Sequence, residues 1–300
     1  MSQTYKNVAL VGASGNIGKI ILDGLVASFQ FSITVLSRKE SEATFPDRVS
    51  VYETDFSDAD LETAFRGKDA VISALGATGF SIQKKIVDAA LRAGVRRFLP
   101  SEFSASSQDE VVLQLLPLFG QKKELIEYLK SKESDTFSWT GIATGLLFDW
   151  GLENGFLGFD ISSKTATIWD GGNKSFTLTN EKHLGQAVAS VLQHPQGTSN
   201  KFLYVASVET TQNNILAALE KETGAKWTVN STTTEEQVGG AVKKLGAGDF
   251  SGAFALVRAT GFGNTPGLRA NYAKDKTLAN GMLGLKLDTV QDTVKRLVAK

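Results

Sequence analysis

The residues NVALVGASGNIG, from Asn7 to Gly18, decide the fold class of this chain. Asn7–Val11 is a short apolar run of the kind that is buried on both faces of a parallel sheet. A turn with the spacing G-x-x-G-x-x-G follows at once, and apolar residues then recur at helical spacing as far as Phe29. A strand, a glycine turn and a helix in this order are typical of a dinucleotide-binding unit.

The three glycines of this turn each have a physical role in binding a pyrophosphate. One permits the sharp turn, the next lets the backbone approach the phosphates, and the last lets the helix pack closely on the strand. The free N–H groups and the positive dipole end of the helix then face the phosphates. A plain tight turn is the alternative interpretation. The residues expected to bind the cofactor here are Gly12, Ser14, Gly15, Asn16, Ile17 and Gly18.

The composition is that of an ordinary globular protein with balanced charge. Among 300 residues, Lys+Arg and Asp+Glu number 32 each, so no net field attracts nucleic acid or an anionic membrane. The absence of cysteine excludes disulfides and thiolate sites, and two histidines do not suggest a metal site. No apolar run reaches the roughly 18 residues of a membrane span. The opening MSQTYKN shows no signal peptide, so we expect a cytoplasmic protein.

The end of the second expected strand, at 32–36, distinguishes between the two nicotinamide cofactors. An Asp or Glu there binds the ribose 2′-OH of NAD, whereas an Arg accommodates the 2′-phosphate of NADP. Here Ser37, Arg38 and Lys39 close the strand, and Glu40 arrives only later. A surface Arg-Lys pair is the alternative. Within a dinucleotide-binding domain the pattern predicts NADP, with Arg38 on the phosphate and Ser37 adding a hydrogen bond.

Strands and helices continue to alternate up to about residue 150. Further strands are expected at 49–53, 70–74, 98–99 and 137–143, and helices at 59–65, 81–93 and 121–129. This alternation predicts an α/β fold of the Rossmann type, a doubly wound parallel sheet. Loops at the carboxyl ends of such strands bind ligands. Those expected to contact the cofactor are Asp55, Phe56, Ala74, Leu75 and Gly76.

Four strings resemble the NmrA-like and isoflavone reductase-like group of atypical short-chain dehydrogenases. They are GASGNIG at 12–18, VLSR at 35–38, Gln83 ahead of IVDAALRAGVRRF, and RFLPSEF at 97–103, which is the most specific. That group includes isoflavone, pinoresinol-lariciresinol and phenylcoumaran benzylic ether reductases. The resemblance covers most of the chain and implies an NADPH-dependent enzyme. It also implies cofactor contacts by Gln83, Ser101, Glu102, Phe103 and Phe148.

The same resemblance points to a catalytic lysine on the helix at 121–129. In the reductases of the group, the proposed catalytic Lys lies seven positions before an apolar residue near the end of this helix. Leu129 therefore indicates Lys122, and Lys123 is the alternative if the register shifts by one. The helix dipole and partial burial beside a nicotinamide would both favour a neutral amine, which can exchange a proton. Two solvated lysines of an amphipathic helix are the alternative interpretation.

Two further features of the sequence concern the residue after SEF and the Tyr-x-x-x-Lys motif of other short-chain dehydrogenases. The family usually has Gly after SEF, where this chain has Ser104. The Tyr-x-x-x-Lys spacing of common short-chain dehydrogenases occurs twice, at 128–132 and at 272–276. Tyr128 lies about 9 Å along the helix from Lys122, away from the ligand edge. We therefore interpret both occurrences as chance.

The second half of the chain is expected to form a smaller lobe. We expect a cofactor domain at 1–150, rejoined by residues from about 176 to 205, and a smaller C-terminal α+β substrate lobe at 151–300. His183 is interpreted as a residue that begins a helix. Glycine-rich residues 246–267 suggest a flexible lid over the substrate, or simply a mobile loop.

Two local patterns in this lobe make further predictions. The runs 165–169 and 176–178 flank the turn 170–173 and predict a β-hairpin. The helix at 235–245 is expected to break at Gly239-Gly240.

These features predict an NADPH-dependent reductase of a small aromatic or conjugated molecule, with Lys122 as the proton donor or acceptor. A non-catalytic NADP(H)-binding sensor of the NmrA type, acting on a protein partner, is the alternative, and an epimerase or dehydratase is more distant. The pattern does not indicate the substrate or the oligomeric state.

Overall fold

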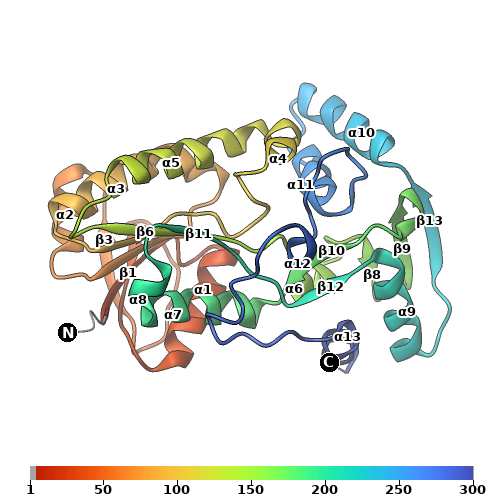
Figure 1. Cartoon of the computed structure of the whole chain (residues 1–300), viewed down its shortest axis with the longest axis horizontal. Helices are drawn as coiled ribbons and strands as arrows, with labels where there is room; N and C mark the ends of the chain where they lie inside the picture. The colour runs from red at the N-terminus through yellow and green to blue at the C-terminus, as the bar shows by residue number, and fades with distance from the viewer. Residues whose placement is uncertain (1–4, 300) are drawn as a thin grey trace.

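A seven-stranded, all-parallel sheet organises the larger part of the molecule in the computed structural model (Figure 1). The model describes residues 5–299; residues 1–4, which begin the segment expected to hold no signal peptide, and residue 300 lie outside the described residues. In spatial order the strands are β11 (Lys201–Tyr204), β6 (Ser138–Ala143), β5 (Arg97–Leu99), β4 (Ala70–Ser73), β1 (Asn7–Val11), β2 (Ser32–Arg38) and β3 (Ser50–Thr54).

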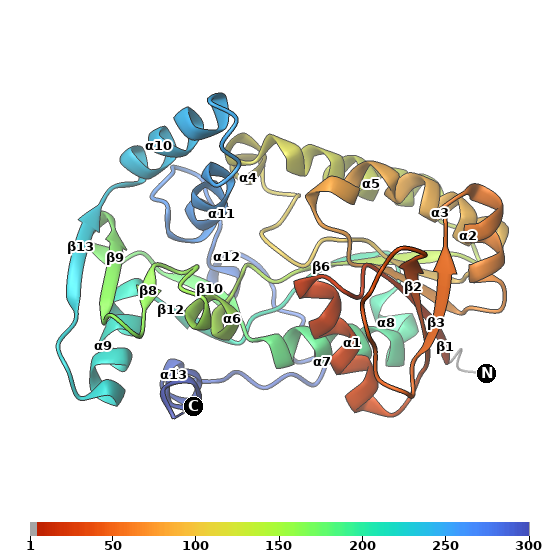
Figure 2. The same ribbon diagram turned by 180° about the vertical axis from the view of Figure 1, so that it is seen from behind.

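Helices cover both faces of this sheet (Figures 1 and 2). One face carries α1 (Asn16–Ser28), α7 (Glu181–Gln193) and α8 (Pro195–Thr198); the other carries α2 (Asp58–Phe65), α3 (Gln83–Arg92) and α5 (Gly120–Ser131). The strand order reverses direction between β1 and β4, which is where open α/β sheets bind ligands. The predicted Rossmann-type doubly wound sheet is thus confirmed.

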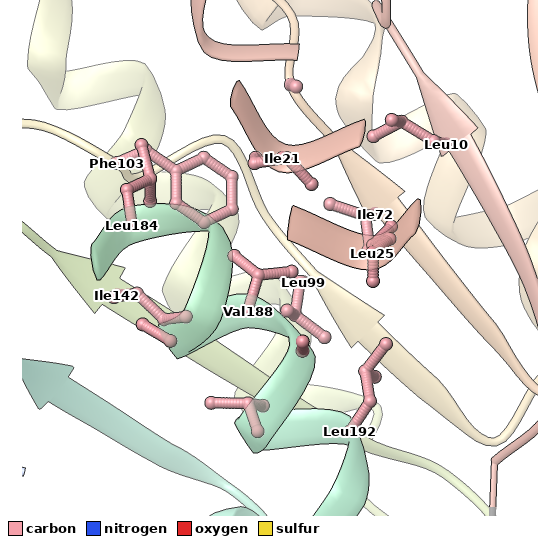
Figure 3. Close-up of a cluster of buried hydrophobic side chains, with 14 of the residues drawn as sticks. Leu10, Ile21, Leu25, Ile72, Leu99, Phe103, Ile142, Leu184, Val188 and Leu192 are labelled. Carbon is pink, nitrogen blue, oxygen red and sulfur yellow. The ribbon is translucent and has the colours of Figure 1, made fainter. Parts of the chain in front are cut away.

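The core follows from the two-residue repeat of the strands. Val8 and Leu10 of β1 point to the α1/α7 side, whereas Ala9 and Val11 point to the α2/α3/α5 side. Figure 3 shows the first of these cores, in which leucines and isoleucines of α1 and the strands meet Leu184, Val188 and Leu192 of α7. A strand buried on both faces must be apolar throughout, which explains the unbroken run NVALV.

Two glycines allow α1 and α7 to touch backbone to backbone. A Cβ atom built on Gly24 would lie 2.4 Å from the backbone of Gly185, and one on Gly185 would lie 2.9 Å from Gly24. Neither helix has room for a side chain at this crossing. The contact ties the first helix of the chain to one that follows it by more than 150 residues.

The smaller part of the molecule contains two three-stranded sheets. One has the order β12 (Val208–Thr210), β10 (Phe176–Thr179), β7 (Leu146–Leu147), and the other β13 (Thr228–Thr232), β9 (Thr165–Trp169), β8 (Phe159–Asp160). The remaining α-helices are α4 (Glu110–Leu115), α6 (Phe148–Glu153), α9 (Gln212–Thr223), α10 (Thr234–Gly246), α11 (Gly252–Phe262), α12 (Tyr272–Asp275) and α13 (Val290–Val298). Short 3-10 helices are η1 (Ala77–Ile82), η2 (Pro117–Phe119) and η3 (Asp170–Gly172). Within residues 5–299, none of the helices combines the length and the apolar character of a membrane span.

The predicted hairpin of residues 165–178 is wrong, because its two strands belong to different sheets. β9 pairs with β8 and β13, and β10 pairs with β7 and β12. Asp170, Gly171 and Gly172 all have positive φ, so the chain turns out of one sheet and enters the other. Alternating apolar residues indicate strands but do not specify their partners.

The predicted break at Gly239-Gly240 is also wrong, and the segment 246–267, expected as a lid or a mobile loop, is half helical. α10 runs unbroken through both glycines, each of which costs only about 1 kcal/mol in a helix interior. A capping box of Thr233 and Glu236 and packing on α11 hold it. Half of the segment 246–267 is the helix α11, whose Phe262 is buried against Phe176 and Trp169.

We predict that Gly24→Ala lowers the free energy of unfolding by about 2 kcal/mol, because the added methyl group overlaps the backbone of α7. Gly239→Ala is the matched control: its Cβ meets nothing within 4 Å, and we expect a gain of about 0.5–1 kcal/mol. Urea denaturation followed by circular dichroism measures both. A Gly24→Ala protein as stable as the parent would show that the helices do not need this contact.

Candidate active site

The glycine turn has the geometry that was expected for close approach of a ligand. Gly12 has φ +87°, and a Cβ there would lie 2.8 Å from the carbonyl oxygen of Ala74, just after β4. A Cβ on Gly18 would lie 2.0 Å from the carbonyl oxygen of Gly12. At Gly15, by contrast, a Cβ would only touch that oxygen at 3.5 Å. The outer two glycines therefore serve packing, and the middle one leaves backbone open to a ligand.

The first turn of α1 is free to bind an anion. Gly15 is its N-cap, no side chain caps it, and its first turn holds no acidic residue. Ser14, Gly15 and Asn16 are exposed, and Ile17 is half-buried. Helix N–H groups and the helix dipole favour negative charge at such an end.

Arg38 and Lys39 lie exposed at the carboxyl end of β2. Among residues 5–299, no hydrogen-bond or ion-pair partner faces the guanidinium of Arg38. The Ser37 hydroxyl donates only to the neighbouring carbonyl of Arg38, at 3.4 Å. Register places Ser37 and Arg38 beside the last two residues of β3.

The residues after β3 form a tight local turn next to this strand end. The Ser57 N–H donates to the Asp55 carboxylate at 2.8 Å, and this bond lowers the pKa of Asp55. Phe56 adopts a left-handed conformation with φ 59° and is half-buried. Both residues remain predicted cofactor contacts.

A chain of contacts leads from the glycine turn to the loop after β5. Ala74 and Leu75 follow β4, and Gly76 caps η1. The Ser101 hydroxyl donates to the Leu75 carbonyl at 2.6 Å, and the Ser101 N–H donates to Gln83 Oε1 at 3.0 Å. Two atoms at this edge, Gln83 Nε2 and Ser73 Oγ, are buried without a hydrogen-bond partner. Unpaired buried polar atoms are rare and unfavourable in folded proteins.

Lys122 lies inside the molecule at this edge, at the start of α5. Its side chain is 4% exposed. Its Nζ donates to the backbone carbonyl of Glu102 and to the Ser104 hydroxyl, both at 2.9 Å. The ring centres of Phe119 and Phe80 lie 4.3 and 4.9 Å from Nζ, a distance at which an ammonium interacts with aromatic faces.

Glu102 is the buried acidic group beside this lysine. Its side chain is 1% exposed; Oε1 accepts a hydrogen bond from Ser107 at 2.9 Å, and Oε2 has no partner. Burial raises the pKa of Glu102 to about 7, although the nearby Lys122 charge opposes this shift. Burial lowers the pKa of Lys122 to about 8, opposed by Glu102. Both groups therefore titrate near neutral pH, as acid–base chemistry requires.

The structure distinguishes Lys122 from Lys123, the alternative candidate for the catalytic lysine. The Lys123 side chain is 37% exposed and forms an ion pair with Glu110 at 2.5 Å. It lies on the outer surface of α5, whereas Lys122 points to the loop that holds Ser101 and Glu102. Only Lys122 of the two is near the residues expected to bind the cofactor.

Among residues 5–299, neither tyrosine of the two Tyr-x-x-x-Lys strings hydrogen-bonds to Lys122. Tyr128 donates to Asp88 at 2.5 Å, and burial, followed by this bond, raises its pKa to about 12. Tyr272 is buried, and its hydroxyl accepts the N–H of Ser106 at 3.0 Å. Burial raises the pKa of Tyr272. Tyr272 thus supports the loop that carries Glu102, a role that its spacing did not indicate.

Two other residues expected to contact the cofactor, Phe103 and Phe148, are buried in hydrophobic cores, and His183 lies near the start of a helix, as expected. The ring of Phe103 lies in the core beside Leu184 (Figure 3). Phe148 has no exposed surface and belongs to the core of the smaller part. His183 lies in the first turn of α7, and its Nδ1 is 2.6 Å from the Ser207 hydroxyl.

Phe80, Phe119, Ser104 and Ser107 surround the Lys122–Glu102 pair, and sequence reasoning did not assign them to the site. Ser104 carried a signal, since it departs from the usual glycine. Phe80 and Phe119 carried none, because aromatic residues are common in any core.

The chain is similar to proteins of a known family. The model of the NmrA-like family matches residues 4–245. Oxidoreductase aprR from Aspergillus flavus is 35% identical over 298 residues, which cover 97% of this chain and 98% of that protein. These matches confirm the predicted resemblance.

Solved structures with a similar fold have lower identities. AtPrR2 with NADP+ and (+)pinoresinol superposes with a TM-score of 0.80 at 20% identity, covering 99% of this chain and 100% of that one. An isoflavone reductase superposes with a TM-score of 0.77 at 20% identity, covering 98% and 99%. At such identities the likeness establishes a common fold.

We predict that Glu102→Gln becomes more stable relative to the parent as pH rises from about 4.5 to about 7. The unfolded carboxyl releases its proton near 4.5 and the folded one near 7, so folding takes up a proton in this window and the parent loses stability as pH rises. Glutamine cannot titrate. Urea midpoints at several pH values measure the difference, with the exposed Glu124→Gln as the control. A constant difference between Glu102→Gln and the parent would contradict the burial of a titrating carboxyl.

Proposed function

The chain belongs to the NmrA-like family and is an oxidoreductase, and on this premise we propose that it is an NADPH-dependent reductase of a small aromatic or conjugated molecule. The observation that carries the proposal is the desolvated Lys122, connected through the Glu102 loop to the glycine turn. We further propose that residues 1–150, with about 176–205, bind the cofactor, and that the remainder of 151–300 contributes to substrate binding.

The residues at the sheet edge fit a dinucleotide phosphate. Gly15 leaves the backbone open at the uncapped end of α1, where Gly12, Ser14, Asn16, Ile17 and Gly18 complete the turn. We assign the pyrophosphate to this end. The unpaired guanidinium of Arg38, with Ser37 and Lys39, would hold the 2′-phosphate, which a planar fork of N–H donors suits.

The nicotinamide half is assigned to the loops after β4 and β5. Gln83 Nε2 is a buried donor without a partner, and Ser101 and Glu102 adjoin it. NADPH, when bound, supplies a hydride. Lys122 supplies the proton that accompanies reduction, and its low pKa makes that transfer easier near neutral pH.

The aromatic surroundings of Lys122 favour an aromatic or conjugated substrate. Phe80 and Phe119 meet edge to face, with ring centres 6.3 Å apart, beside the Lys122 ammonium. Such rings pack well against flat, unsaturated molecules. The structure of similar fold that contains (+)pinoresinol holds a molecule of this class.

The cofactor assignment predicts that Arg38→Ala weakens NADPH binding about 10- to 100-fold, because a charged phosphate contact is lost, and leaves NADH binding unchanged. Fluorescence titration of both cofactors measures this. Arg66→Ala, which removes an exposed arginine just after α2, is the matched control. Equal affinity of the parent protein for NADPH and NADH would overturn the NADP assignment.

The catalytic assignment predicts that Lys122→Ala reduces kcat about 10²- to 10⁴-fold, the usual contribution of a general acid, while NADPH binding persists. NADPH oxidation with a panel of enones, quinones and benzylic ethers is the assay, and Lys123→Ala is the control. An active Lys122→Ala enzyme would overturn the role of Lys122. Tight NADPH binding without turnover of any compound by the parent would instead favour a sensor.

A further inference from the structure

Ser104 provides the only side-chain hydroxyl that contacts Lys122 among residues 5–299. Three atoms form a closed triangle: Lys122 Nζ donates at 2.9 Å to Ser104 Oγ and at 2.9 Å to the Glu102 carbonyl, and Ser104 Oγ donates to that same carbonyl at 2.6 Å. Two of the three ammonium protons are thereby bound to neutral oxygens.

The two oxygens differ in what they do when Lys122 loses a proton. A carbonyl oxygen can only accept, so it can serve only N–H groups. A hydroxyl both accepts and donates, and its hydrogen rotates freely about the C–O bond. The Ser104 hydroxyl can therefore accept from the ammonium and, after rotation, donate to the lone pair of the neutral amine.

Among residues 5–299, the Glu102 carbonyl and the Ser104 hydroxyl are the only hydrogen-bond partners of Lys122 Nζ. Phe80 and Phe119 present ring faces to Nζ, and Glu102, the charged group that acts on the pKa of Lys122, is acidic. Lys122 is almost fully buried, so water cannot replace a missing partner easily. An unpaired amine in such a place is unfavourable.

Backbone hydrogen bonds also hold the loop at Ser104. The Ser104 carbonyl accepts the N–H groups of Thr144 and Gly145, at 3.0 and 3.1 Å. These bonds do not involve the side chain, so we expect the loop to stay in place when the hydroxyl is removed.

We propose that Ser104 is a positioning residue that keeps Lys122 hydrogen-bonded in both of its protonation states. The inference rests on the proposed role of Lys122 as proton donor. In the ammonium state Ser104 Oγ accepts from Nζ. When Nζ gives its proton to the substrate, the Ser104 O–H turns from the Glu102 carbonyl to the new lone pair, and the proton count of Ser104 does not change.

The test measures Lys122 itself, without substrate or cofactor. In the full chain labelled with ¹³C-lysine, the Cε resonance of Lys122 is assigned by its loss in Lys122→Arg and followed through a pH titration. We expect Ser104→Ala and Ser104→Gly to lower the pKa of Lys122 by about one unit, because hydrogen bonds to charged groups are stronger than those to neutral ones. Ser104→Thr keeps a hydroxyl and should keep the parent value.

Activity provides the second measurement. With a compound that the parent reduces, Ser104→Ala should lower kcat about tenfold with little change in KM, and its pH profile should shift with the pKa of Lys122. Ser104→Thr should restore both. A role in folding alone would lower stability without moving the pKa of Lys122.

The outcomes separate this inference from the proposed function. An unchanged Lys122 titration in both Ser104→Ala and Ser104→Gly would overturn the role of Ser104 and leave the cofactor and Lys122 assignments standing. Full activity of Lys122→Ala would overturn the proposed role of Lys122 itself, whatever the Ser104 variants show.

Discussion

The ligand edge of this protein depends on close backbone packing that only glycine allows. Gly12 lies against the carbonyl after β4, and Gly18 lies against the carbonyl of Gly12. This packing brings the end of β1, the start of α1 and the end of β4 together. From there, hydrogen bonds of Ser101 continue to the loop after β5, whose Glu102 carbonyl binds Lys122. The proposed phosphate site and the lysine are therefore connected by a continuous series of contacts.

Removal from water determines the direction of the pKa shifts of Glu102 and Lys122. Removing a carboxyl and an ammonium from water disfavours both charges, so burial raises the pKa of Glu102 and lowers that of Lys122 toward each other. The ammonium is stabilised instead by a backbone carbonyl, a hydroxyl and two aromatic faces. None of these partners removes the proton outright. Burial thus lowers the pKa of this amine near the sheet edge, as the proposed role of Lys122 in proton transfer requires.

Segments from the second half of the chain are tied to the first half by contacts between residues far apart in the sequence. α7 packs on α1 through the Gly24–Gly185 contact, and β11 extends the central sheet beyond β6. Tyr272, from late in the chain, bonds to Ser106 on the Lys122 loop. The same overall fold occurs at about 20% identity in reductases that differ in substrate, so function must be argued from the site. Ser104, which contacts Lys122, is one of the residues of this site.

The sequence alone determined the strands of the parallel sheet, the glycine turn and the family, because each depends on local periodicity or on residues adjacent in the chain. It also indicated Lys122, although only through resemblance. Tertiary structure decided what depends on contacts between distant segments. The alternating pattern at 165–178 indicated two strands, but not that β9 and β10 belong to different sheets. The sequence around Gly239 likewise gave no sign that packing on α11 supports α10. Lys122 is buried, whereas Lys123 is partly exposed. The sequence could not show this difference, because the loops around Lys122 come together only in the folded chain.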